Sequence, residues 1–564
     1  MESNLEQFAP LFQPDTYSPD DQWHLAPFFT NLEKSVYVPL VVSPELIGAL
    51  CSRTSRAAGD LRHIFLNEFV YPFVRPVRDA KDTDDTWQEK IQHGEALKDF
   101  ITFLHQHPLV ELFSNPRARS FYNTWLAQYG DDSIAQMAGG HLVYSGISQV
   151  TIKHLEDQRV SLAPIEKSTR YVNYGVQTNG SYRYYTDPTL KQMGLAEEYR
   201  RAMDTLFETY KRLIPRMIAW LTEQFPQEKP SVIEKKAFDT LRGLLPNAAL
   251  SQVAFFGNGQ AFEYLMARSL RHGLGEIRWA ARSALKELHQ VVPSFLRRAS
   301  EEKAKEYHEY LANKKTRMAP LVETILGKNR IQSVNEPRVT LIEYDLDGET
   351  KIIAGILYDA PNNHATWEEN LGRARAMTHE KRKQIFDTCL AGRTARWQKM
   401  RRGFENVYVR FEIVMNIGAW RDLHRHRMHT QERQNFSCYH GFDIPPEIVS
   451  AGLENDFASA LNPLEDVFQK IVPRDPDLAQ YATTLAHRVR FMQWQNLRQA
   501  FWETELRTIP EGHPDYRVIE QQKYLELKKV YPLIADYMLV NMGNYDFARR
   551  GQEEKIQKKL EKLT

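Results

Sequence analysis

The alternation of apolar and polar residues is clearest in the segment 338–360, RVTLIEYDLDGETKIIAGILYDA. It predicts two strands joined by a turn at Asp347-Gly348, because Asp-Gly favours hairpin connections. The preceding segment 301–317, EEKAKEYHEYLANKKTR, is highly charged. Such a segment predicts a solvated helix or a linker. We therefore place a domain boundary between the two segments, near Ile325.

Three strings carry signals for the start of a helix. Ser43 in SPELIGAL is placed to cap a helix whose first residue is Pro44. Asn462 in NPLEDVF is a second cap, with a proline next and a glutamate three residues on, which is a capping-box arrangement. DPDLAQ repeats the Asp-Pro start at Asp475.

Two strings from distant parts of the chain resemble each other. In NGQAFEYLMARS an Ala-Phe pair is followed by an arginine, with Phe262 and Arg268 as the matching positions. In NLRQAFWETELRT the spacing from Phe501 to Arg507 is the same. Both strings have helical character, so the two arginines should project from similar points. The match indicates a weak internal repeat on either side of the predicted boundary.

Composition narrows the classes of protein that the chain can belong to. It has 564 residues with 73 Lys+Arg and 72 Asp+Glu, which argues against a protein that coats nucleic acid. Three widely separated cysteines (Cys51, Cys389 and Cys438) predict neither a disulfide framework nor a zinc site. No signal peptide or membrane-spanning apolar run is visible. We expect a soluble cytoplasmic protein with neither a nucleic-acid nor a membrane partner.

The string RDLHRHRMHTQERQNFS contains Arg425-His426-Arg427 directly after the apolar run VYVRFEIVMNIGAW. Burying two arginines without an anion is costly, and the arginine fork suits phosphate oxygens. The string therefore suggests a diphosphate or flavin clamp. For an isolated RHR string, a solvated charged face is the commoner alternative.

A metal site is the other hypothesis that this string raises. His424, His426 and His429 lie close in sequence, but three arginines surround them and would repel a divalent cation. No cysteine or carboxylate cluster completes a ligand shell. We expect no metal, and we expect these histidines to hydrogen-bond an anion or the backbone.

The string PIEKSTRY places a carboxylate, a hydroxyl and a guanidinium at alternate positions, Glu166, Ser168 and Arg170. An extended segment would put all three on one face. Together they could bind a ribose hydroxyl, a pyrimidine edge and a phosphate. The alternative is an exposed strand with an internal Glu–Arg pair.

Taken together, RHR and PIEKSTRY resemble one continuous motif of the flavin-dependent thymidylate synthases, the ThyX family, in which RHR is followed closely by NExSxRY. Here each half of the chain keeps a different part. The first half has Asp157-Gln158-Arg159 where RHR would stand. The second half has Arg433 and Asn435 where the motif glutamate and serine would stand.

Further strings extend the resemblance. Arg242 precedes Leu-Pro as in the family's RxxLP string, and Arg498 and Arg507 match its N-x-R…LR string. The string YGDDSIAQMAGGHLVYSGIS is similar to the family's GHxSxxEH…GIS stretch. It departs from that stretch at Asp131 and Gln136, where the family often has histidine and glutamate.

The resemblance implies a role for each of these residues. It implies that FAD is bound by Arg425, His426, Arg427 and Arg498, that the nucleotide is bound by Glu166, Ser168, Arg170 and Arg242, and that Arg507 polarises the pyrimidine. The flavin set is intact only in the second half and the nucleotide set only in the first. That division suggests a duplicated chain whose halves together build one composite site.

The implied fold is α/β, of the α+β type, with two tandem ThyX-like repeats that form a pseudo-dimer. Each repeat would have an antiparallel sheet and long helices. We expect an N-terminal extension over 1–40, a first repeat over 41–325 and a second over 326–564. ThyX proteins are homotetramers, so the tandem chain is expected to form a homodimer.

Three functional hypotheses follow. The first is methylation of C5 of dUMP with methylenetetrahydrofolate as carbon donor, FAD as cofactor and NADPH as reductant. The second keeps the fold and changes the pyrimidine nucleotide, because the RHR string is rewritten after its third residue. The third is a catalytically inert descendant that binds flavin or nucleotide, or serves only in assembly, which the changes at Asp131 and Gln136 favour.

Overall fold

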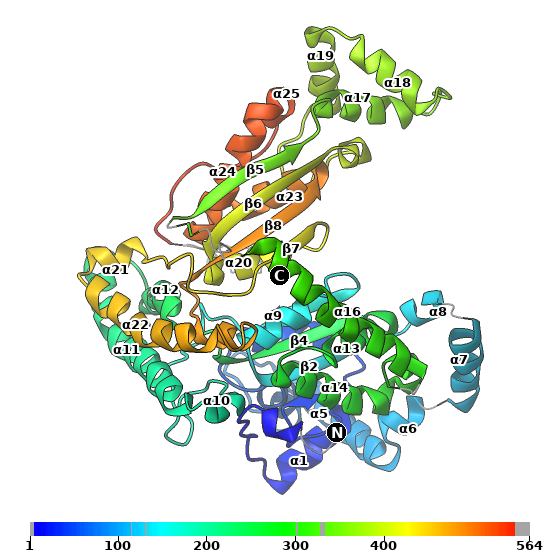
Figure 1. Ribbon diagram of the computed structural model, residues 1–564. Coiled ribbons are helices and arrows are strands. Elements are labelled where there is room, and N and C mark those ends of the chain that lie inside the picture. The colour runs from blue at the N-terminus through cyan, green and yellow to red at the C-terminus, as the bar shows by residue number, and fades with distance from the viewer. Residues whose placement is uncertain are drawn as a thin grey trace. The chain divides into compact units, whose positions relative to one another are not determined.

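The computed structural model describes residues 5–113, 115–129, 132–300, 303–327, 333–334 and 336–547. The chain forms two compact units (Figure 1). The first comprises residues 1–330 and 444–484, and the second comprises 331–443 and 485–564. Each unit is described below by itself. The predicted boundaries at residues 40 and 325 concern sequence repeats, and they stay predictions.

The first unit contains a four-stranded antiparallel sheet of β1 (Val36–Tyr37), β2 (Gly139–Ser148), β3 (Leu162–Glu166) and β4 (Leu250–Asn258), in the order β1-β2-β4-β3. A bulge interrupts the pairing of β2 with β4 at Gly146, whose φ of +85° suits a residue without a side chain. Apolar residues of β2 and β4, among them Leu142 and Phe255, join the hydrophobic core of this unit.

Helices and short helical turns make up most of the rest of the first unit. Residues 1–330 contribute η2 (Glu6–Phe8), α1 (Pro19–Leu25), η3 (Ala26–Phe28), α2 (Pro44–Thr54), α3 (Leu61–Ile64), η4 (Phe65–Val70), α4 (Tyr71–Val74), α5 (Asp84–Gln106), α6 (Leu109–Phe113), α7 (Pro116–Tyr129), α8 (Asp132–Gln136), α9 (Gln149–Glu156), α10 (Thr189–Gln192), α11 (Ala196–Gln224), α12 (Pro230–Leu241), η5 (Arg242–Leu244), α13 (Gly259–Ser269), α14 (Gly275–Val291), η6 (Pro293–Phe295), α15 (Arg297–Ser300) and α16 (Lys303–Leu326). Residues 444–484 add α21 (Pro446–Ser450), α22 (Glu454–Ile471) and η8 (Leu478–Ala482).

The second unit contains another four-stranded antiparallel sheet, of β5 (Arg338–Tyr344), β6 (Tyr408–Asn416), β7 (Thr430–Arg433) and β8 (Arg488–Asn496), in the order β5-β6-β8-β7. Its helical elements are α17 (Gly348–Tyr358), α18 (Trp367–Arg375), α19 (His379–Cys389), η7 (Arg402–Asn406), α20 (Ile417–His424), α23 (Leu497–Arg507), α24 (Pro514–Val530) and α25 (Pro532–Ala535).

The two sheets have the same topology, with the second strand next to the fourth and the third strand at an edge. In each sheet the second strand runs directly into a helix, β2 into α9 and β6 into α20. The fourth strand does the same, β4 into α13 and β8 into α23. Asn258 and Asn496 cap these last two helices with their side chains. The prediction of two tandem α+β repeats is confirmed.

Several local predictions can now be compared with the structure. Ser43 caps α2 with Pro44 at its first turn, as predicted. The charged segment forms α16, which confirms its helical alternative within the part of it that the structure describes. The second strand predicted after Asp347 is wrong, because residues 348–358 form α17.

The other two predicted helix starts are also wrong. Pro463 lies inside α22, which begins eight residues before the predicted cap Asn462. At Asp475 no long helix begins, although its carboxylate accepts a hydrogen bond from the Leu478 amide at 2.9 Å. The element that follows is the short turn η8.

Candidate functional site

In the second unit, Arg425-His426-Arg427 follows the end of α20, after the buried strand β6. The imidazole of His426 is buried, whereas Arg425 and Arg427 on either side of it are exposed. The burial of two arginines that the apolar run suggested does not occur. The string instead presents two guanidinium groups to solvent around one buried ring.

His426 is held by hydrogen bonds at both ring nitrogens. The Arg507 Nε–H donates to His426 Nε2 at 2.8 Å, and the Gln499 side chain lies 3.3 Å from Nδ1. Because Nε2 accepts, the proton of the neutral ring is on Nδ1. The Gln499 amide nitrogen faces Nδ1, so a hydrogen bond from Nδ1 requires the amide to be turned until its oxygen faces the ring. Burial lowers the pKa of His426 to about 3, so the ring is neutral at physiological pH.

Arg507 is oriented by a second contact. One of its terminal NH groups donates to the backbone carbonyl of Asp422 at 2.5 Å, and Asp422 also forms an ion pair with Arg425. Of the predicted flavin-side residues, the structure thus brings together Arg425, His426 and Arg507 around the last turn of α20. We call these three residues with Asp422 the α20 cluster.

Arg427 and Arg498, the other members of the predicted flavin set, lie outside this cluster, and Arg498 is held by contacts of its own. Its Nε donates to the Met400 carbonyl at 2.9 Å and its Nη1 forms an ion pair with Glu405 at 2.6 Å. Arginine hydrogen bonds lower the pKa of Glu405 even though partial burial would raise it. These contacts fix Arg498 against η7, at the start of α23.

A buried ionic network beside His426 was missed by the sequence reasoning. The Lys523 ammonium lies 3.3 Å from Glu503 and 3.1 Å from Glu520, and all three side chains are fully buried. Burial would raise the pKa of Glu503, but the Lys523 ammonium holds it below its usual range. Burial raises the pKa of Glu520 to about 8, although Lys523 opposes that shift. Glutamates and a lysine spaced along amphipathic helices read as surface charges, so the sequence offered no signal for this network.

In the first unit, Glu166 ends β3 and its carboxylate is buried against Lys153 of α9 at 2.7 Å. The same ammonium lies 2.6 Å from Glu156. The prediction that Glu166, Ser168 and Arg170 share one extended face is wrong. The strand stops at Glu166, and a turn follows in which the Tyr171 amide donates to the Ser168 carbonyl. Lys153 was not singled out from the sequence.

Arg170 and Arg242 meet through a carboxylate that the sequence analysis did not name. Asp239 of α12 lies 3.0 Å from an Arg170 Nη and 3.5 Å from the Arg242 Nε. All three side chains are almost fully buried. Two predicted nucleotide-side arginines are therefore held at one place, here called the Asp239 cluster. Ser168 lies between Glu166 and this cluster in sequence, with its hydroxyl accepting from the Arg170 amide at 3.2 Å.

The two repeats share one arginine contact. Arg268 donates to the backbone carbonyl of His154 at 2.5 Å, as Arg507 does to that of Asp422. His154 and Asp422 occupy the same position in α9 and α20, three residues before Asp157 and Arg425. The contact supports the sequence match between the arginines and places Gln158 at the position of His426.

Gln136, one of the two departures in the upstream string, donates from its amide nitrogen to the Gln260 oxygen at 3.0 Å. Asp131, the other departure, lies outside the described residues.

Within the described part of the chain, helices that are both long and apolar enough to cross a membrane are absent.

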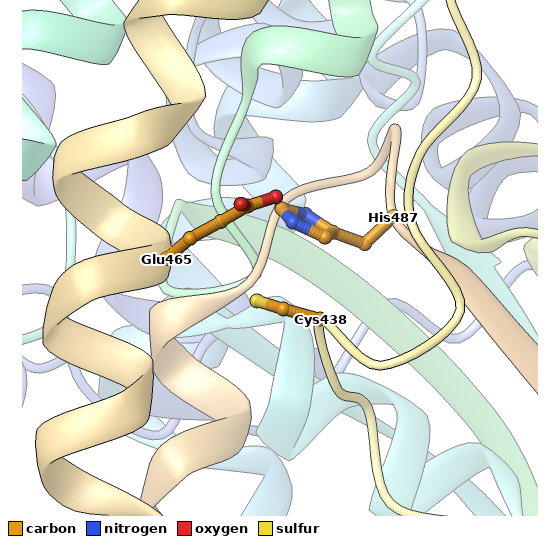
Figure 2. Close-up of side chains that lie close together, drawn as sticks. All are labelled: Cys438, Glu465 and His487. Carbon is orange, nitrogen blue, oxygen red and sulfur yellow. The ribbon is translucent and has the colours of Figure 1, made fainter. Parts of the chain in front are cut away.

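His424, His426 and His429 do not belong to a group of potential metal ligands among the residues that the structure describes. Among the described residues, the one group of potential ligands is Cys438, Glu465 and His487, which excludes those histidines (Figure 2). Cys438 and His487 belong to the second unit and Glu465 to the first. A metal site needs ligands that are fixed relative to one another, so these three residues carry no argument for one.

Comparison with known proteins shows that the sequence matches the model of one protein family. The sequence model described as "Thymidylate synthase complementing protein" matches residues 88–294 and 340–533, one match in each repeat. A UPF0159 protein of Chlamydia pneumoniae is 33% identical over 540 residues, which cover 94% of this chain and 96% of that relative.

More distant relatives cover single repeats. A flavin-dependent thymidylate synthase of Corynebacterium efficiens is 27% identical over 230 residues, which are 39% of this chain and 84% of that protein. Among solved structures, a UMP/dUMP methylase, PolB from Streptomyces cacaoi, bound with 5-Br dUMP, covers 37% of this chain and 100% of its own. Its sequence identity is 12% and its TM-score is 0.31, so the likeness supports no functional conclusion.

Proposed function

The chain belongs to the thymidylate synthase complementing protein family, and from this premise we propose that it is a flavin-dependent enzyme that methylates C5 of dUMP. The proposed carbon donor is methylenetetrahydrofolate, and the proposed reductant of the flavin is NADPH. The observation that carries the proposal is the α20 cluster, in which Arg507 is bonded to a neutral, buried His426.

The α20 cluster fits an anionic cofactor such as FAD. Arg425 and Arg427 are exposed, so their guanidinium forks can reach diphosphate oxygens. The neutral ring of His426 adds no third positive charge and fixes the direction of Arg507. We propose that Arg425, His426, Arg427 and Arg498 hold FAD, which would supply the hydride for the methyl group.

The Asp239 cluster is the proposed nucleotide side. Arg170 and Arg242 share one carboxylate, so their guanidinium groups are held in place before a ligand arrives, which reduces the entropy lost on binding. We propose that these two arginines bind the phosphate and that Glu166 and Ser168 contact the sugar and base. The Lys153 ammonium lies 2.7 Å from the Glu166 carboxylate and fixes its position.

Arg507 is the proposed catalytic residue. A guanidinium that donates to a pyrimidine carbonyl oxygen would draw electron density from the ring and stabilise negative charge that develops there. Its contacts with His426 and the Asp422 carbonyl orient it for that task. No protein nucleophile is required.

A second candidate keeps the fold and the flavin but uses another pyrimidine nucleotide. It is favoured by Arg433, which lies opposite Phe491 on β8 as Glu166 lies opposite Val253 on β4. The second repeat therefore has a cation where the first has the motif carboxylate. The third candidate is an inert flavin- or nucleotide-binding protein.

The first experiment is an absorbance spectrum of the purified protein before and after the addition of FAD. We expect a bound-flavin spectrum that is lost in Arg427→Ala and kept in Arg375→Ala, an exposed arginine of the same unit that pairs with Asp347. A protein that binds no FAD overturns the proposal. Another outcome is bound flavin that is not oxidised when a pyrimidine nucleotide and methylenetetrahydrofolate are added together. That result favours the inert protein.

Oligomeric state is a separate part of the proposal. We propose a homodimer of tandem chains, and light scattering coupled to gel filtration tests it. A mass near 132 kDa, twice the 65.8 kDa of one chain, is the expected result.

A further inference from the structure

The first unit contains a cavity of about 290 Å³. None of the residues proposed above to bind flavin or nucleotide lines it. Its walls come from the N-terminal segment at residues 11–15, from the loop 58–60 and from strands β2 and β4. The irregular segment 172–184 completes it. The family match begins at residue 88, so the first two of these walls lie outside it. Residues outside the family match therefore help to form the cavity.

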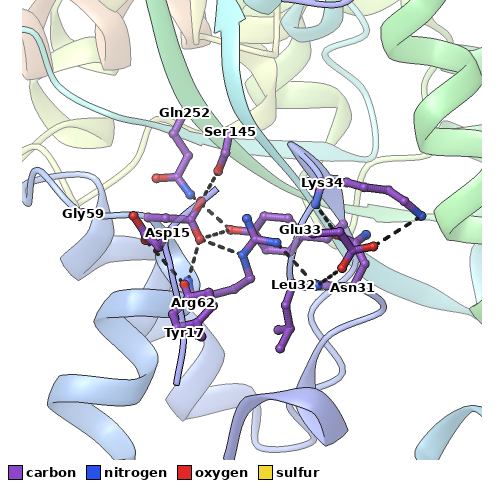
Figure 3. A network of polar contacts seen from close by, with 12 residues as sticks. Asp15, Tyr17, Asn31, Leu32, Glu33, Lys34, Gly59, Arg62, Ser145 and Gln252 are labelled. Atoms are coloured by element: carbon purple, nitrogen blue, oxygen red, sulfur yellow. Dashed lines mark hydrogen bonds and ion pairs between the residues drawn. The ribbon is translucent and has the colours of Figure 1, made fainter. Parts of the chain in front are cut away.

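One side of the cavity is lined by Asp60, Ser145 and Gln252, which belong to a network of hydrogen bonds. Figure 3 shows this network, with Ser145 and Gln252 labelled. The carboxylate of Asp60 accepts from the Ser145 hydroxyl at 2.5 Å, from the Tyr37 hydroxyl at 3.1 Å and from the Arg62 Nε at 2.9 Å. The pKa of Asp60 is held below its usual range by these donors, although burial alone would raise it. The network fixes Asp60 in place, and the negative charge of Asp60 is paired with Arg62.

Gln252 extends this network and lines the cavity. Its amide nitrogen donates to the Tyr37 hydroxyl at 3.3 Å. The Tyr37 proton is used by Asp60, so Tyr37 can only accept from Gln252, and this assigns the amide orientation. The other end of the amide, Oε1, is buried and accepts no hydrogen bond from the residues that the structure describes. A buried acceptor without a donor is costly, and a donor on a ligand would satisfy it.

Lys167 supplies a cation at the same cavity, and its side chain is buried, with only 8% of the residue exposed. Its ammonium donates to the carbonyls of Ala58 at 2.9 Å and Gly59 at 2.8 Å. An ammonium has three donors, so one remains beyond these two bonds. Burial lowers the pKa of Lys167 to about 8, with Asp60 opposing that shift and Arg183 adding to it.

Arg183 is a second cation on the cavity wall, and it is exposed. Lys167 and Arg183 line the same cavity. The positive charge of Arg183 contributes to the lowered pKa of Lys167, whereas Asp60 and Asp15 oppose that shift. Within the described ranges, its guanidinium has neither a hydrogen bond nor an ion pair. An anion between the two cations would relieve their repulsion.

The remaining lining mixes apolar and aromatic side chains with polar ones, among them Asp15, Asn173 and Ser251. It includes Phe12, Val172, Val176 and Tyr182, and Tyr182 is stacked on Phe207 from behind at 5.1 Å between ring centroids. Cavities of this size with an apolar wall and a few polar groups suit small molecules. The polar groups here include the cations Lys167 and Arg183, the carboxylate of Asp15 and the amide of Gln252, so positive charge exceeds negative charge by one among them.

We propose that this cavity binds a small organic anion with a flat, polar ring. Its acidic group would lie between Lys167 and Arg183, and an N–H of its ring would donate to Gln252 Oε1. A nucleoside monophosphate and a heteroaromatic carboxylate share this chemistry. The site is separate from the α20 cluster and the Asp239 cluster in its residues, and it does not depend on the proposed methylation.

Isothermal titration calorimetry with four probes tests the proposal. Uridine 5′-monophosphate and orotate carry both a ring N–H and an anion, benzoate lacks the N–H, and inorganic phosphate lacks the ring. We expect one of the first two probes to bind more tightly than benzoate and phosphate. Binding by the monophosphate alone identifies a phosphate ligand, and binding by orotate alone identifies a carboxylate.

Variants assign the binding to the cavity. Arg183→Ala should raise the Kd of the bound probe about tenfold, the effect of losing one charged contact. Arg201→Ala, an exposed arginine on α11, is the matched control and should leave the Kd unchanged. Gln252→Met should abolish the preference for the N–H-bearing ring over benzoate. Because Arg183 is exposed, its removal should not unfold the protein, and a melting curve checks this.

Three results would overturn the proposal. One is that none of the four probes binds. Another is that inorganic phosphate binds as tightly as the ring-bearing probes. The third is binding that is unchanged in Arg183→Ala but lost in Arg242→Ala, which would assign the probe to the Asp239 cluster.

Discussion

At His426, burial and hydrogen bonding act in the same direction. Both favour the neutral ring, since Arg507 needs a lone pair on Nε2 to donate to and burial disfavours a charge. Protonation would place a second cation against the guanidinium. The direction in which Arg507 points thus depends on a ring that stays neutral.

This dependence predicts how stability changes with pH. The pKa of His426 falls from 6.5 to about 3 on folding, so the unfolded chain binds a proton below pH 6.5 that the folded chain does not. The contribution of His426 to the free energy of unfolding is complete above pH 6.5. It decreases as the pH falls toward 3, by about 1.4 kcal/mol per pH unit.

His426→Gln isolates this contribution, because Gln158 stands at the same position of the first repeat and an amide does not titrate. Urea unfolding of the wild type and the variant from pH 7 to pH 4 is the measurement. We expect the difference in unfolding free energy to shift in favour of the variant as pH falls. A difference that is independent of pH would contradict a neutral buried His426.

The Asp239 cluster gives a second prediction at this scale. Asp239→Asn removes the charge that Arg170 and Arg242 share in a buried place, which should cost about 3 kcal/mol of unfolding free energy. The control is Asp456→Asn, whose carboxylate also pairs with two arginines, Arg212 and Arg216, but on the surface. It should cost less than about 1 kcal/mol. Equal costs in urea unfolding would show that burial does not set the strength of the Asp239 cluster.

Sequence reasoning could name the arginines but not their partners. Arg170, Arg242 and Arg507 stand in recognisable strings, whereas Asp239 lies in an ordinary helical pattern. Lys153 and Lys523 read as surface lysines, since lysines are rarely buried unless paired. Their pairing depends on tertiary contacts that no local pattern records.

At the scale of the element, the repeated strand-to-helix junctions give a paired prediction. Asn258 accepts from the Ala261 amide at 2.9 Å and Asn496 from the Gln499 amide at 2.9 Å. Asn258→Ala and Asn496→Ala should each cost about 1 kcal/mol of unfolding free energy, because each removes a helix cap. Asn→Ser at the same positions keeps the cap and should cost much less. If the alanine and serine variants unfold at the same urea concentration, the caps do not stabilise these helices.

The misassigned elements have an identifiable physical cause. The β-branched string KIIAGIL favours a strand locally, yet residues 348–358 form α17. Ile352, Ile353 and Ala354 are fully buried in this helix, and burial of this kind outweighs a weak local preference. A Cβ at Gly355 would lie 2.9 Å from the Gly403 Cα, so both glycines allow a close packing that sequence periodicity does not reveal.

At the scale of the whole molecule, the compact units and the sequence repeats are different divisions of the chain. Residues 444–484 come late in the sequence but pack into the first unit, where Tyr481 donates to the buried Glu276 carboxylate at 2.7 Å. Motif strings can reveal two repeats because they recur along the chain. They carry no information on which unit such a segment joins, since that depends on long-range contacts.

The division of the two residue sets between the repeats predicts a stoichiometry. Only the second repeat has Arg-His-Arg after the helix that follows its second strand; the first has Asp157-Gln158-Arg159. An aspartate at the first of these positions would repel a diphosphate, and Arg159 sits in a strained backbone conformation with φ of +53°. We therefore expect about one FAD per chain, although the chain has two repeats.

The measurement is the ratio of flavin absorbance to protein concentration after saturation with FAD and removal of the excess. Arg427→Ala should reduce the ratio to near zero, and Arg159→Ala should leave it near one, because Arg159 is not part of the proposed flavin site. Arg242→Ala should also leave it unchanged while weakening the binding of dUMP, since that residue belongs to the nucleotide set. A ratio near two that falls to one in Arg159→Ala would mean that the first repeat has kept a flavin site despite Asp157 and Gln158, and the complementary loss of motif residues would then need another cause.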